Sequence, residues 1–458
     1  MRRIALVGLV SFSIFVGFHE ASVFATTTIS VASYGAQCDG VTDDTSAIQS
    51  ALDAAAAAGG GTVMLPNSTC LLNSFAPSSH PWAFYNLHVP SGVTLQGVTG
   101  SMLLQGSGGR QSISNVRGGA TWIENAVVTV GNNYATVAFQ NSGNGGFYSL
   151  QAMTVGSPSV RLTTAAQAAN FAVGDYVAIY EYTGGDVLPA QMSQVTGVNA
   201  ASGDLILADS VIRPFAAPSI AKVTSLAAHD IAINSVIVQG AVPLAVTETF
   251  NFSASNDQFL SDTSIGGGNI FELELNTVEH FAFTGNTIIA INGGYIRQEL
   301  CQRDSQNGAW TGNTFQDTAV GFGEYAANIT NGSNCLMLVG HATVASGNAI
   351  TATGSATGVY VADSFANVTN NTIQIGRGNG ILLYSPPFSA RRWPATRCPG
   401  RGGSAFMSAR FPRTLAVITS TATLSAGSRL RSPSILIEID GMLAEGAIST
   451  ALAVTAKA

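Results

Sequence analysis

Charged side chains are scarce in this sequence. They make up 10% of its 458 residues, and the formal net charge is −7. Proteins that bind duplex nucleic acid show a clustered basic face. The mild acidity therefore argues against nucleic acid as a partner, and it leaves a surface dominated by uncharged polar side chains.

Metal-type cysteine pairs and long apolar runs are also lacking. None of the five cysteines forms the Cys-x-x-Cys spacing typical of a zinc site, so we expect no metal centre. After residues 4–18, no segment approaches the roughly 20 apolar residues that cross a bilayer. The sequence therefore predicts no membrane span.

The amino terminus has the composition of a secretory signal. Arg2 and Arg3 precede the apolar run, and Val23-Phe24-Ala25 supplies a small-residue cleavage site. We predict that residues 1–25 are a signal peptide and that the mature protein is secreted or periplasmic.

Export to an oxidising compartment permits disulfides. Cys38 and Cys70 flank the first helix-strand unit, whereas Cys301 and Cys335 lie in consecutive repeat connections, which leaves Cys398 over. Either pair can form a disulfide. Free or buried thiols are the alternative, because the pairing cannot be read from sequence alone.

A repeated tetrapeptide organises residues 278–384. Its four copies are Gly285-Asn286-Thr287-Ile288, Gly312-Asn313-Thr314-Phe315, Gly347-Asn348-Ala349-Ile350 and Asn370-Asn371-Thr372-Ile373. Each copy is followed by a glycine and a short β-prone run, beginning at Gly294, Gly321, Gly358 and Gly380. Self-similarity at a period of roughly 20–50 residues is typical of solenoids. The shortage of helix formers favours a β-solenoid over helical repeats.

Stacking explains why such a repeat is stable, because one rung cannot bury its apolar face alone. An asparagine at the same corner of every rung can hydrogen-bond along the stack, and glycine takes the corners that need a positive φ. Ordinary turn chemistry in an antiparallel β-sandwich is the alternative. The agreement of four copies in order and in the following strand favours the solenoid.

Residues 29–73 read as a strand, a capped helix, a glycine stop and a second strand. Thr42, Asp43 or Asp44 can cap the helix. Within the helix, residues 48–55 carry one apolar stripe at helical spacing.

The same stretch resembles the opening of the pectate-lyase-superfamily and polygalacturonase-like right-handed parallel β-helix proteins. The matching residues are Tyr34-Gly35-Ala36, Asp39-Gly40-Val41-Thr42-Asp43-Asp44-Thr45, Ala47-Ile48-Gln49, Gly59-Gly60-Gly61-Thr62-Val63 and Leu65-Pro66. The resemblance implies an all-β fold, a right-handed parallel β-helix whose amino-terminal end is covered by the helix. It implies little about activity, since hydrolases, lyases, transferases and phage tailspikes share this opening.

Composition divides the chain after the signal peptide into two parts. We predict a β-helix domain over residues 26–385, with a small antiparallel β insertion at about 160–225, where Asp209 is expected in a solvated turn. Residues 386–458 are rich in arginine and proline and contain no further copy of the repeat. We interpret them as an atypical tail, degenerate or frameshifted.

The motif sets of pectin-degrading relatives are incomplete in this sequence. Of the polygalacturonase motifs, only Gly340-His341-Ala342 is a partial match. Arg392-Trp393-Pro394-Ala395-Thr396-Arg397 matches the pectate-lyase Arg-x-Pro-x-x-Arg motif, where an arginine acts as a base or clamps a uronate carboxylate. No acidic calcium cluster accompanies it. His229-Asp230 resembles a pair in alginate-epimerase-like β-helices. We expect no cofactor, with calcium possible if the protein is a lyase.

Aligning the repeat strands on their glycines predicts two polar columns. Arg297 lies beside Glu324 in one column, while Glu299 and Asp363 lie in the other with one rung between them, roughly 9–10 Å apart. A carboxylate pair at about 6.5–9.5 Å suits inverting glycoside hydrolysis.

We accordingly predict Glu299, Asp363 and Glu324 as catalytic residues, and Arg297, Tyr325 and Tyr360 as substrate-binding residues. Solvated charges on an outer face, including a surface pair of little energetic consequence, are the alternative.

The predicted function is cleavage of a pectin-like or other acidic polysaccharide, by glycoside hydrolysis or β-elimination. A non-catalytic β-helix, acting as an adhesin or glycan-binding scaffold, is the alternative. A groove with converging carboxylates favours the enzyme. The sequence leaves the oligomeric state open.

Overall fold

The computed structural model describes the solenoid, the insertion and one strand of the tail. The described residues are 27–76, 84–109, 124–131, 147–182, 187–211, 218–222, 228–262, 273–291, 305–317, 334–341, 343–352, 357–364, 367–375, 381–383 and 417–424. No helix among these residues has the length and apolar character needed to cross a membrane.

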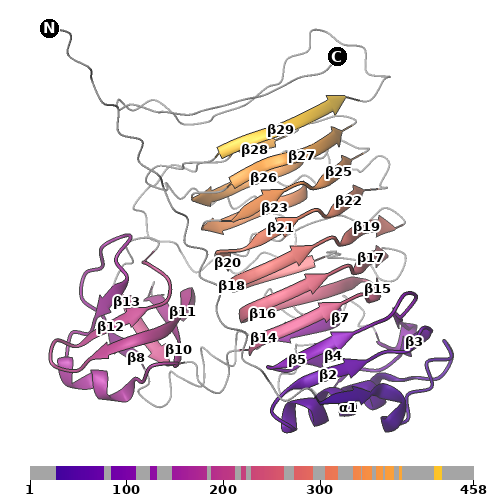
Figure 1. Ribbon diagram of the computed structural model, residues 1–458, viewed down its shortest axis with the longest axis horizontal. Helices are drawn as coiled ribbons and strands as arrows, with labels where there is room; N and C mark the ends of the chain where they lie inside the picture. Colours follow the sequence, from indigo (N-terminus) through magenta and orange to yellow (C-terminus); the bar gives the residue numbers. More distant parts are fainter. Residues whose placement is uncertain are drawn as a thin grey trace, which may run out of the picture.

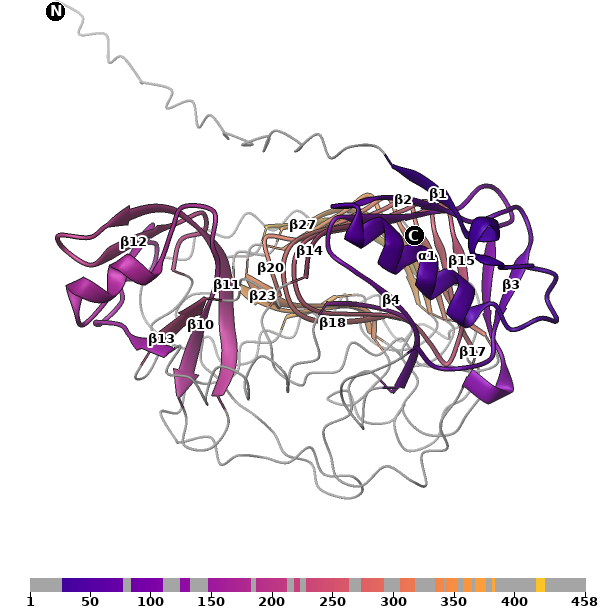
Figure 2. The same cartoon turned by 90° about the horizontal axis from the view of Figure 1, so that it is seen from below.

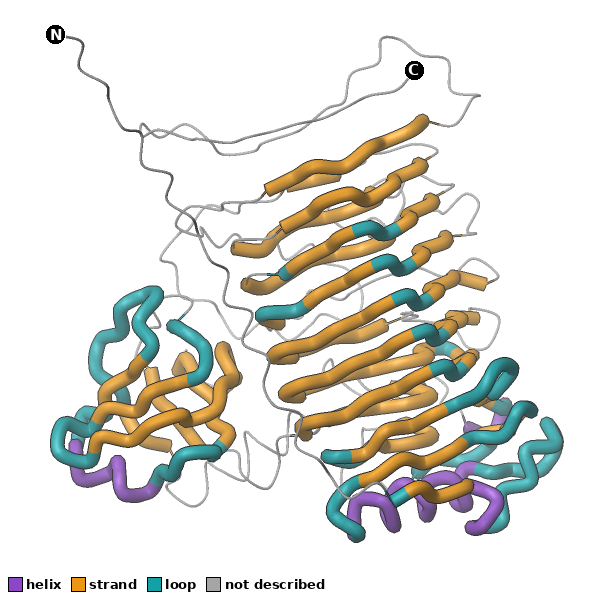
Figure 3. Tube along the Cα trace, viewed as in Figure 1, coloured by secondary structure: helices purple, strands orange, loops and turns teal. Residues whose placement is uncertain are grey.

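Within the described part of the chain, 23 strands form one parallel assembly that stacks along the solenoid (Figures 1 and 3). They are β1 Thr28–Ser30, β2 Gly61–Met64, β3 Thr69–Leu72, β4 Phe84–Val89, β5 Val93–Gln96, β6 Met102–Gln105, β7 Glu124–Gly131, β14 Ala228–Asn234, β15 Ile237–Gly240, β16 Val242–Ser255, β17 Gln258–Asp262, β18 Leu273–Thr284, β19 Thr287–Ile291, β20 Ser305–Gln306, β21 Ala309–Thr311, β22 Thr314–Asp317, β23 Asn334–His341, β24 Val344–Ser346, β25 Ala349–Ala352, β26 Thr357–Ser364, β27 Asn367–Ile375, β28 Ile381–Leu383 and β29 Val417–Leu424. The prediction of a parallel β-helix is confirmed.

The long strands β16 and β18 show how the chain turns a corner. The first half of β16 pairs with β7, and its second half pairs with β14. Strand β18 follows β16 in register along both halves. The interior of the stack is a continuous apolar core, in which Phe252, Phe283, Trp310 and Phe315 are almost fully buried.

The insertion is a separate antiparallel sheet beside the solenoid (Figure 1). Its strands are β8 Phe147–Ser149, β9 Ser159–Arg161, β10 Tyr176–Tyr182, β11 Val187–Asn199, β12 Asp204–Leu207 and β13 Pro218–Lys222. Its apolar residues form their own cluster, including Leu162, Val177 and Leu205. The predicted insertion is confirmed, and its first strand lies ahead of the expected start near residue 160.

Helix α1, Thr45–Ala57, covers the amino-terminal end of the solenoid (Figure 2). Its predicted apolar stripe is buried, with Leu52 fully inaccessible. Asp44 occupies the N-cap position without a side-chain capping bond, and Asp43 Oδ1 accepts a hydrogen bond from the backbone N–H of Thr45, the first residue of the helix, at 3.1 Å. Asp44 instead accepts the backbone N–H groups of Gln37 and Cys38, which fixes the loop before the helix. Short 3-10 helices occur at Val31–Tyr34, Ser107–Gly109 and Ala165–Asn170.

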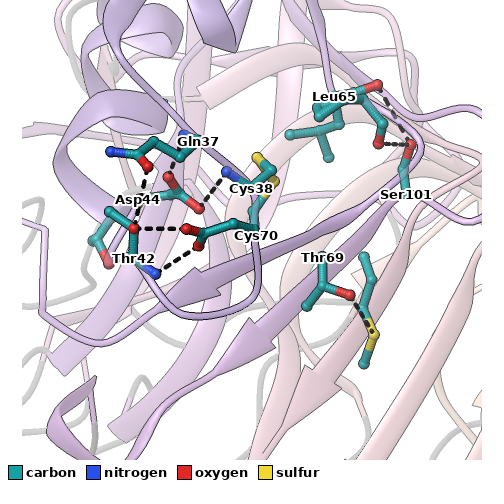
Figure 4. Close-up of a disulfide and its surroundings, with 12 residues drawn as sticks. Gln37, Cys38, Thr42, Asp44, Leu65, Thr69, Cys70 and Ser101 are labelled. Atoms are coloured by element: carbon teal, nitrogen blue, oxygen red, sulfur yellow. Dashed lines mark hydrogen bonds between the residues drawn. A yellow bond between two sulfur atoms is a disulfide. The ribbon is translucent and has the colours of Figure 1, made fainter.

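A disulfide joins Cys38 to Cys70, and so ties the loop before α1 to strand β3 (Figure 4). Of the two pairings that the sequence allowed, this one is confirmed. Cys301 and Cys398 lie outside the described residues, as does the side chain of Cys335.

The repeated asparagines form a buried hydrogen-bonded ladder along one edge of the solenoid. Asn286, Asn313, Asn348 and Asn371 occupy the same position in successive rungs, and each backbone N–H of the first three donates to the next amide oxygen at 2.9 Å. The residues that precede these asparagines, Gly285, Gly312, Gly347 and Asn370, have φ between 56° and 67°. The predicted amide ladder and its left-handed corners are therefore present.

An aspartate replaces the amide at the amino-terminal end of this ladder. The backbone N–H of Asp257 donates to Asn286 Oδ1, and its own Oδ1 accepts the Val236 N–H. Its Oδ2 is buried without a hydrogen-bond partner. Burial raises the pKa of Asp257 to about 8, so the carboxyl favours its protonated form at neutral pH.

Replacing Asp257 with asparagine is expected to stabilise the protein at alkaline pH. The folded pKa lies above the unfolded value of 3.8, so folding stability is complete below about pH 4 and is lost as the pH rises toward 8. The loss at pH 8 is on the order of 2–5 kcal/mol, and Asp257→Asn removes it. Urea denaturation at pH 5 and pH 8 measures this difference. Parallel losses in wild type and variant would contradict the assignment.

The predicted signal peptide and most of the tail lie outside the described residues, so the division of the chain stays a prediction. Within residues 386–458, the structure describes strand β29, which pairs in parallel with β27 and adds to the stack.

Candidate functional site

One corner of the solenoid carries a row of polar residues in the left-handed backbone region. Asp230, Asn251, His280 and Asn307 have φ between 51° and 56°. The strand pairing passes over these residues. For example, His229 pairs with Phe250 and Ile231 pairs with Phe252, so Asp230 and Asn251 lie between paired positions. Asparagine, aspartate and histidine tolerate this conformation better than most residues. We call these four residues and the ones immediately before them the polar corner.

The insertion contributes a carboxylate to the polar corner. Asp209, which follows β12, places Oδ1 2.8 Å from Nε2 of His280 on β18. Ser193 on β11 donates to the other carboxylate oxygen at 3.1 Å. The side chain of Asp209 is 7% exposed and that of His280 is 39% exposed. A half-exposed imidazole is thus held by a buried carboxylate from another sheet.

A second buried carboxylate completes this cluster. Glu279 Oε1 lies 3.9 Å from His280 Nε2, and Asn307 Nδ2 donates to both Glu279 Oε1 at 2.7 Å and Asp209 Oδ1 at 3.0 Å. Burial, reinforced by the nearby charge of Asp209, raises the pKa of Glu279 well above its usual value. Glu279 therefore favours its neutral form beside the ionisable pair.

The chemistry of the cluster is that of an oriented base. With Nε2–H donating to Asp209, Nδ1 is the imidazole nitrogen that remains to accept a proton. The two buried carboxylates do not themselves face solvent, since the side chain of Glu279 is only 2% exposed. Among the described residues, the accessible acid-base group of this cluster is therefore His280.

The cluster does not fit calcium. Asp209, Glu279 and His280 bring three possible ligand atoms within 4.8 Å of one another. Calcium takes six to eight oxygen ligands, whereas this set offers two carboxylates and an imidazole, with the Asn307 amide donor directed at both carboxylates. We assign no step to a metal here.

A second imidazole lies on β14 at the same corner. His229 Nδ1 is 2.9 Å from Asp230 Oδ2, and both side chains are 31% exposed. Asn251 Nδ2 donates to Asp230 Oδ1 at 3.0 Å. Tyr176 of the insertion stacks on the His229 ring, with centroids 4.7 Å apart. Burial, reinforced by Asp230, raises the pKa of Tyr176 to about 12.

The structure describes few of the site residues predicted from sequence. Glu299, Glu324, Arg297 and Tyr325 lie outside the described residues. Tyr360 and Asp363 lie on β26, whose backbone pairing is described although these two side chains are not.

The predicted column containing Asp363 is partly wrong. Val361 lies beside Leu383, as expected. On the other side, however, Asp363 lies beside Gly340 of β23, not beside Ala326. The connections between repeats differ in length, so alignment on glycines chose the wrong neighbour for β26.

The observed register places Asp363 one residue before the row of paired residues that passes through the polar corner. Its neighbour Ser364 pairs with His341, which continues the row formed by Gln306 and Glu279. Two rungs lie between Asp363 and the rung of Glu279, a separation of about 14 Å along the stack. The facing of Asp363 and Glu299 stays a prediction, because Glu299 lies outside the described residues.

Sequence reasoning missed the central residues of the cluster. Asp209 was expected in a solvated turn and is instead buried, and no sequence signal links it to a strand far along the chain. Glu279 and His280 did have a signal. In four successive rungs a polar residue precedes the left-handed turn residue by five positions, as Asp230 precedes Ser235 and His280 precedes Gly285.

Comparison with known proteins supports the resemblance seen at the amino terminus. Residues 28–137 match the family model described as rhamnogalacturonase A/epimerase, pectate lyase-like. Over 36 residues the chain is 69% identical to the mannuronan C5-epimerases AlgE5 and AlgE2 of Azotobacter vinelandii. That alignment spans 8% of this chain and 4% of the length of either epimerase.

Solved structures of similar shape have low sequence identity. The tailspike gp61 of Pseudomonas phage phi297 aligns with a TM-score of 0.46 and 13% identity, over 87% of this chain and 70% of the tailspike. The A-module of the mannuronan C-5 epimerase AlgE4 of Azotobacter vinelandii aligns with a TM-score of 0.36 and 15% identity, over 87% of this chain and 89% of that module. The family match over residues 28–137 confirms the predicted resemblance to pectate-lyase-like β-helix proteins.

Proposed function

We propose that the protein is an exported enzyme that cleaves an acidic polysaccharide by β-elimination at the polar corner. The observation that carries this proposal is the half-exposed His280 imidazole, held 2.8 Å from the buried Asp209 carboxylate. The match of the first rungs to a pectate lyase-like family model supports a carbohydrate substrate.

Elimination suits this arrangement better than hydrolysis. Inverting and retaining hydrolases use two carboxyl groups that flank the scissile bond, whereas both carboxylates of this cluster are buried. In the proposed step His280 Nδ1 takes the proton at C5 of a uronate. The released electron pair forms the C4–C5 double bond, and the glycosidic oxygen leaves and takes a proton from solvent.

The residues predicted from sequence retain a place in this proposal. An arginine clamps a uronate carboxylate through paired N–H donors, and Arg297 is our proposed residue for that role. Glu299, Asp363 and Glu324 stay proposed acid-base groups for the hydrolytic alternative, and Tyr325 and Tyr360 stay proposed sugar contacts. Export by the signal peptide at residues 1–25 is part of the same proposal.

A panel of polysaccharides tests the proposal. The mature protein is incubated with uronate-containing and neutral polymers, while reducing ends and the ultraviolet absorbance of unsaturated uronates are followed together. We expect both signals to rise in parallel on a uronate polymer. Reducing ends without absorbance would indicate hydrolysis, with the Glu299 and Asp363 pair tested next by Glu299→Gln and Asp363→Asn. Binding without either signal would favour the scaffold or adhesin.

A further inference from the structure

Two oriented imidazoles occupy the polar corner. His229 on β14 and His280 on β18 are separated by the single rung of β16, and therefore lie about 10 Å apart along the solenoid axis. Each has a carboxylate partner within 2.9 Å. Each also meets a residue of the insertion, Tyr176 in the first case and Asp209 in the second.

A row of rings connects the two imidazoles. Tyr176 stacks on His229 and also meets Phe250 edge-on, with ring centroids 5.1 Å apart. Phe250 in turn meets His280 edge-on, with ring centroids 5.2 Å apart. The order His229, Phe250, His280 follows the solenoid axis, because these residues lie on successive rungs. A polymer held at both histidines would run along this axis, across the strands.

We infer that His229 is a second glycan contact, binding a hydroxyl group of a sugar unit about 10 Å from the bond that reacts at His280. Asp230 orients the ring by pairing with Nδ1, and Asn251 fixes Asp230 in turn. Tyr176 holds the ring plane by stacking at an interplanar angle of 17°. With Nδ1 occupied, Nε2 is the nitrogen that hydrogen-bonds the sugar. This inference rests on the proposed function and extends the site along the chain of the substrate.

The test compares long and short substrates. For a long polymer, His229→Ala is expected to raise KM roughly tenfold, the effect of losing one hydrogen bond, while kcat changes less than about threefold. His229→Gln keeps a hydrogen-bonding group and is expected to recover much of the loss. An oligosaccharide too short to reach His229 is expected to show little difference between wild type and either variant. Asp204→Asn, at an exposed pair with Arg161 on the insertion, is the matched control with wild-type KM.

Several results would overturn the inference. An unchanged KM for the long polymer in His229→Ala excludes the contact, as does an equal rise for long and short substrates. A fall of kcat by about a hundredfold or more with unchanged KM places His229 in the chemistry instead.

A binding measurement separates this inference from the proposed function. Affinity electrophoresis of the full chain in gels containing each polymer of the panel requires no turnover. If no polymer is cleaved but His229→Ala still weakens binding of one polymer about tenfold, the contact stands and the elimination mechanism falls. If wild type cleaves a polymer and His229→Ala binds it equally well, only the contact falls. Equal thermal unfolding of His229→Gln and wild type shows that the corner is folded.

Discussion

Replacing His280 with asparagine is expected to lower kcat by about 10²–10⁴-fold, the usual contribution of a positioned general base. Asparagine suits this test, because it tolerates the φ of 55° that His280 adopts and so preserves the bend. The amide cannot accept the substrate proton. Initial rates of unsaturated-product formation on a uronate polymer measure the effect.

Two companion variants make the His280 result specific. Asp209→Asn keeps the shape of the carboxylate but removes the charge that holds Nε2. It is expected to lower kcat, because the ionised partner that orients the imidazole is lost. Asp204→Asn removes a carboxylate from the exposed pair with Arg161 and is expected to retain wild-type rates. Wild-type turnover in His280→Asn would remove His280 from the mechanism.

Replacing Asn313 with alanine is expected to destabilise the solenoid by roughly 3–5 kcal/mol. Asn313 is fully buried. Its Oδ1 accepts the backbone N–H and the side-chain amide of Asn286, and its own amide donates to Phe283 O and Asn348 Oδ1. Alanine removes these four buried hydrogen bonds, which join Asn313 to both neighbouring rungs. The free energy of unfolding in urea measures the loss.

The control for Asn313 lies on the adjoining strand. Gln316 on β22 is exposed, and Gln316→Ala is expected to change the free energy of unfolding by less than about 0.5 kcal/mol. Equal effects of the two substitutions would show that the ladder does not stabilise the stack.

The repeating parts of the fold were predictable because each rung solves the same local problem. Asn286, Asn313 and Asn348 recur with glycine before them, since a left-handed corner and a buried amide are needed at every turn. The cap was equally readable, because the buried stripe around Leu52 follows helical spacing. Local chemistry determines both features.

The site was less predictable because its parts come from distant segments. The contact between Asp209 and His280 depends on how the insertion docks, which no local pattern encodes. The column of Asp363 depends on connection lengths, and Gly340 became its neighbour where glycine spacing indicated Ala326. Polar residues at the bends, such as His280, did carry a local signal, because they precede the left-handed turn residue of the same rung by five positions.

The most direct test of the central claim, that His280 abstracts a sugar proton at the polar corner, is a kinetic isotope effect. A uronate polymer carrying deuterium at C5 is compared with the unlabelled polymer under conditions where the bond-breaking step limits the rate. We expect kcat/KM to fall several-fold on the labelled polymer, with unsaturated product formed from both. Equal rates on the two polymers, with saturated products, would contradict the account and show that the C5 proton is not removed.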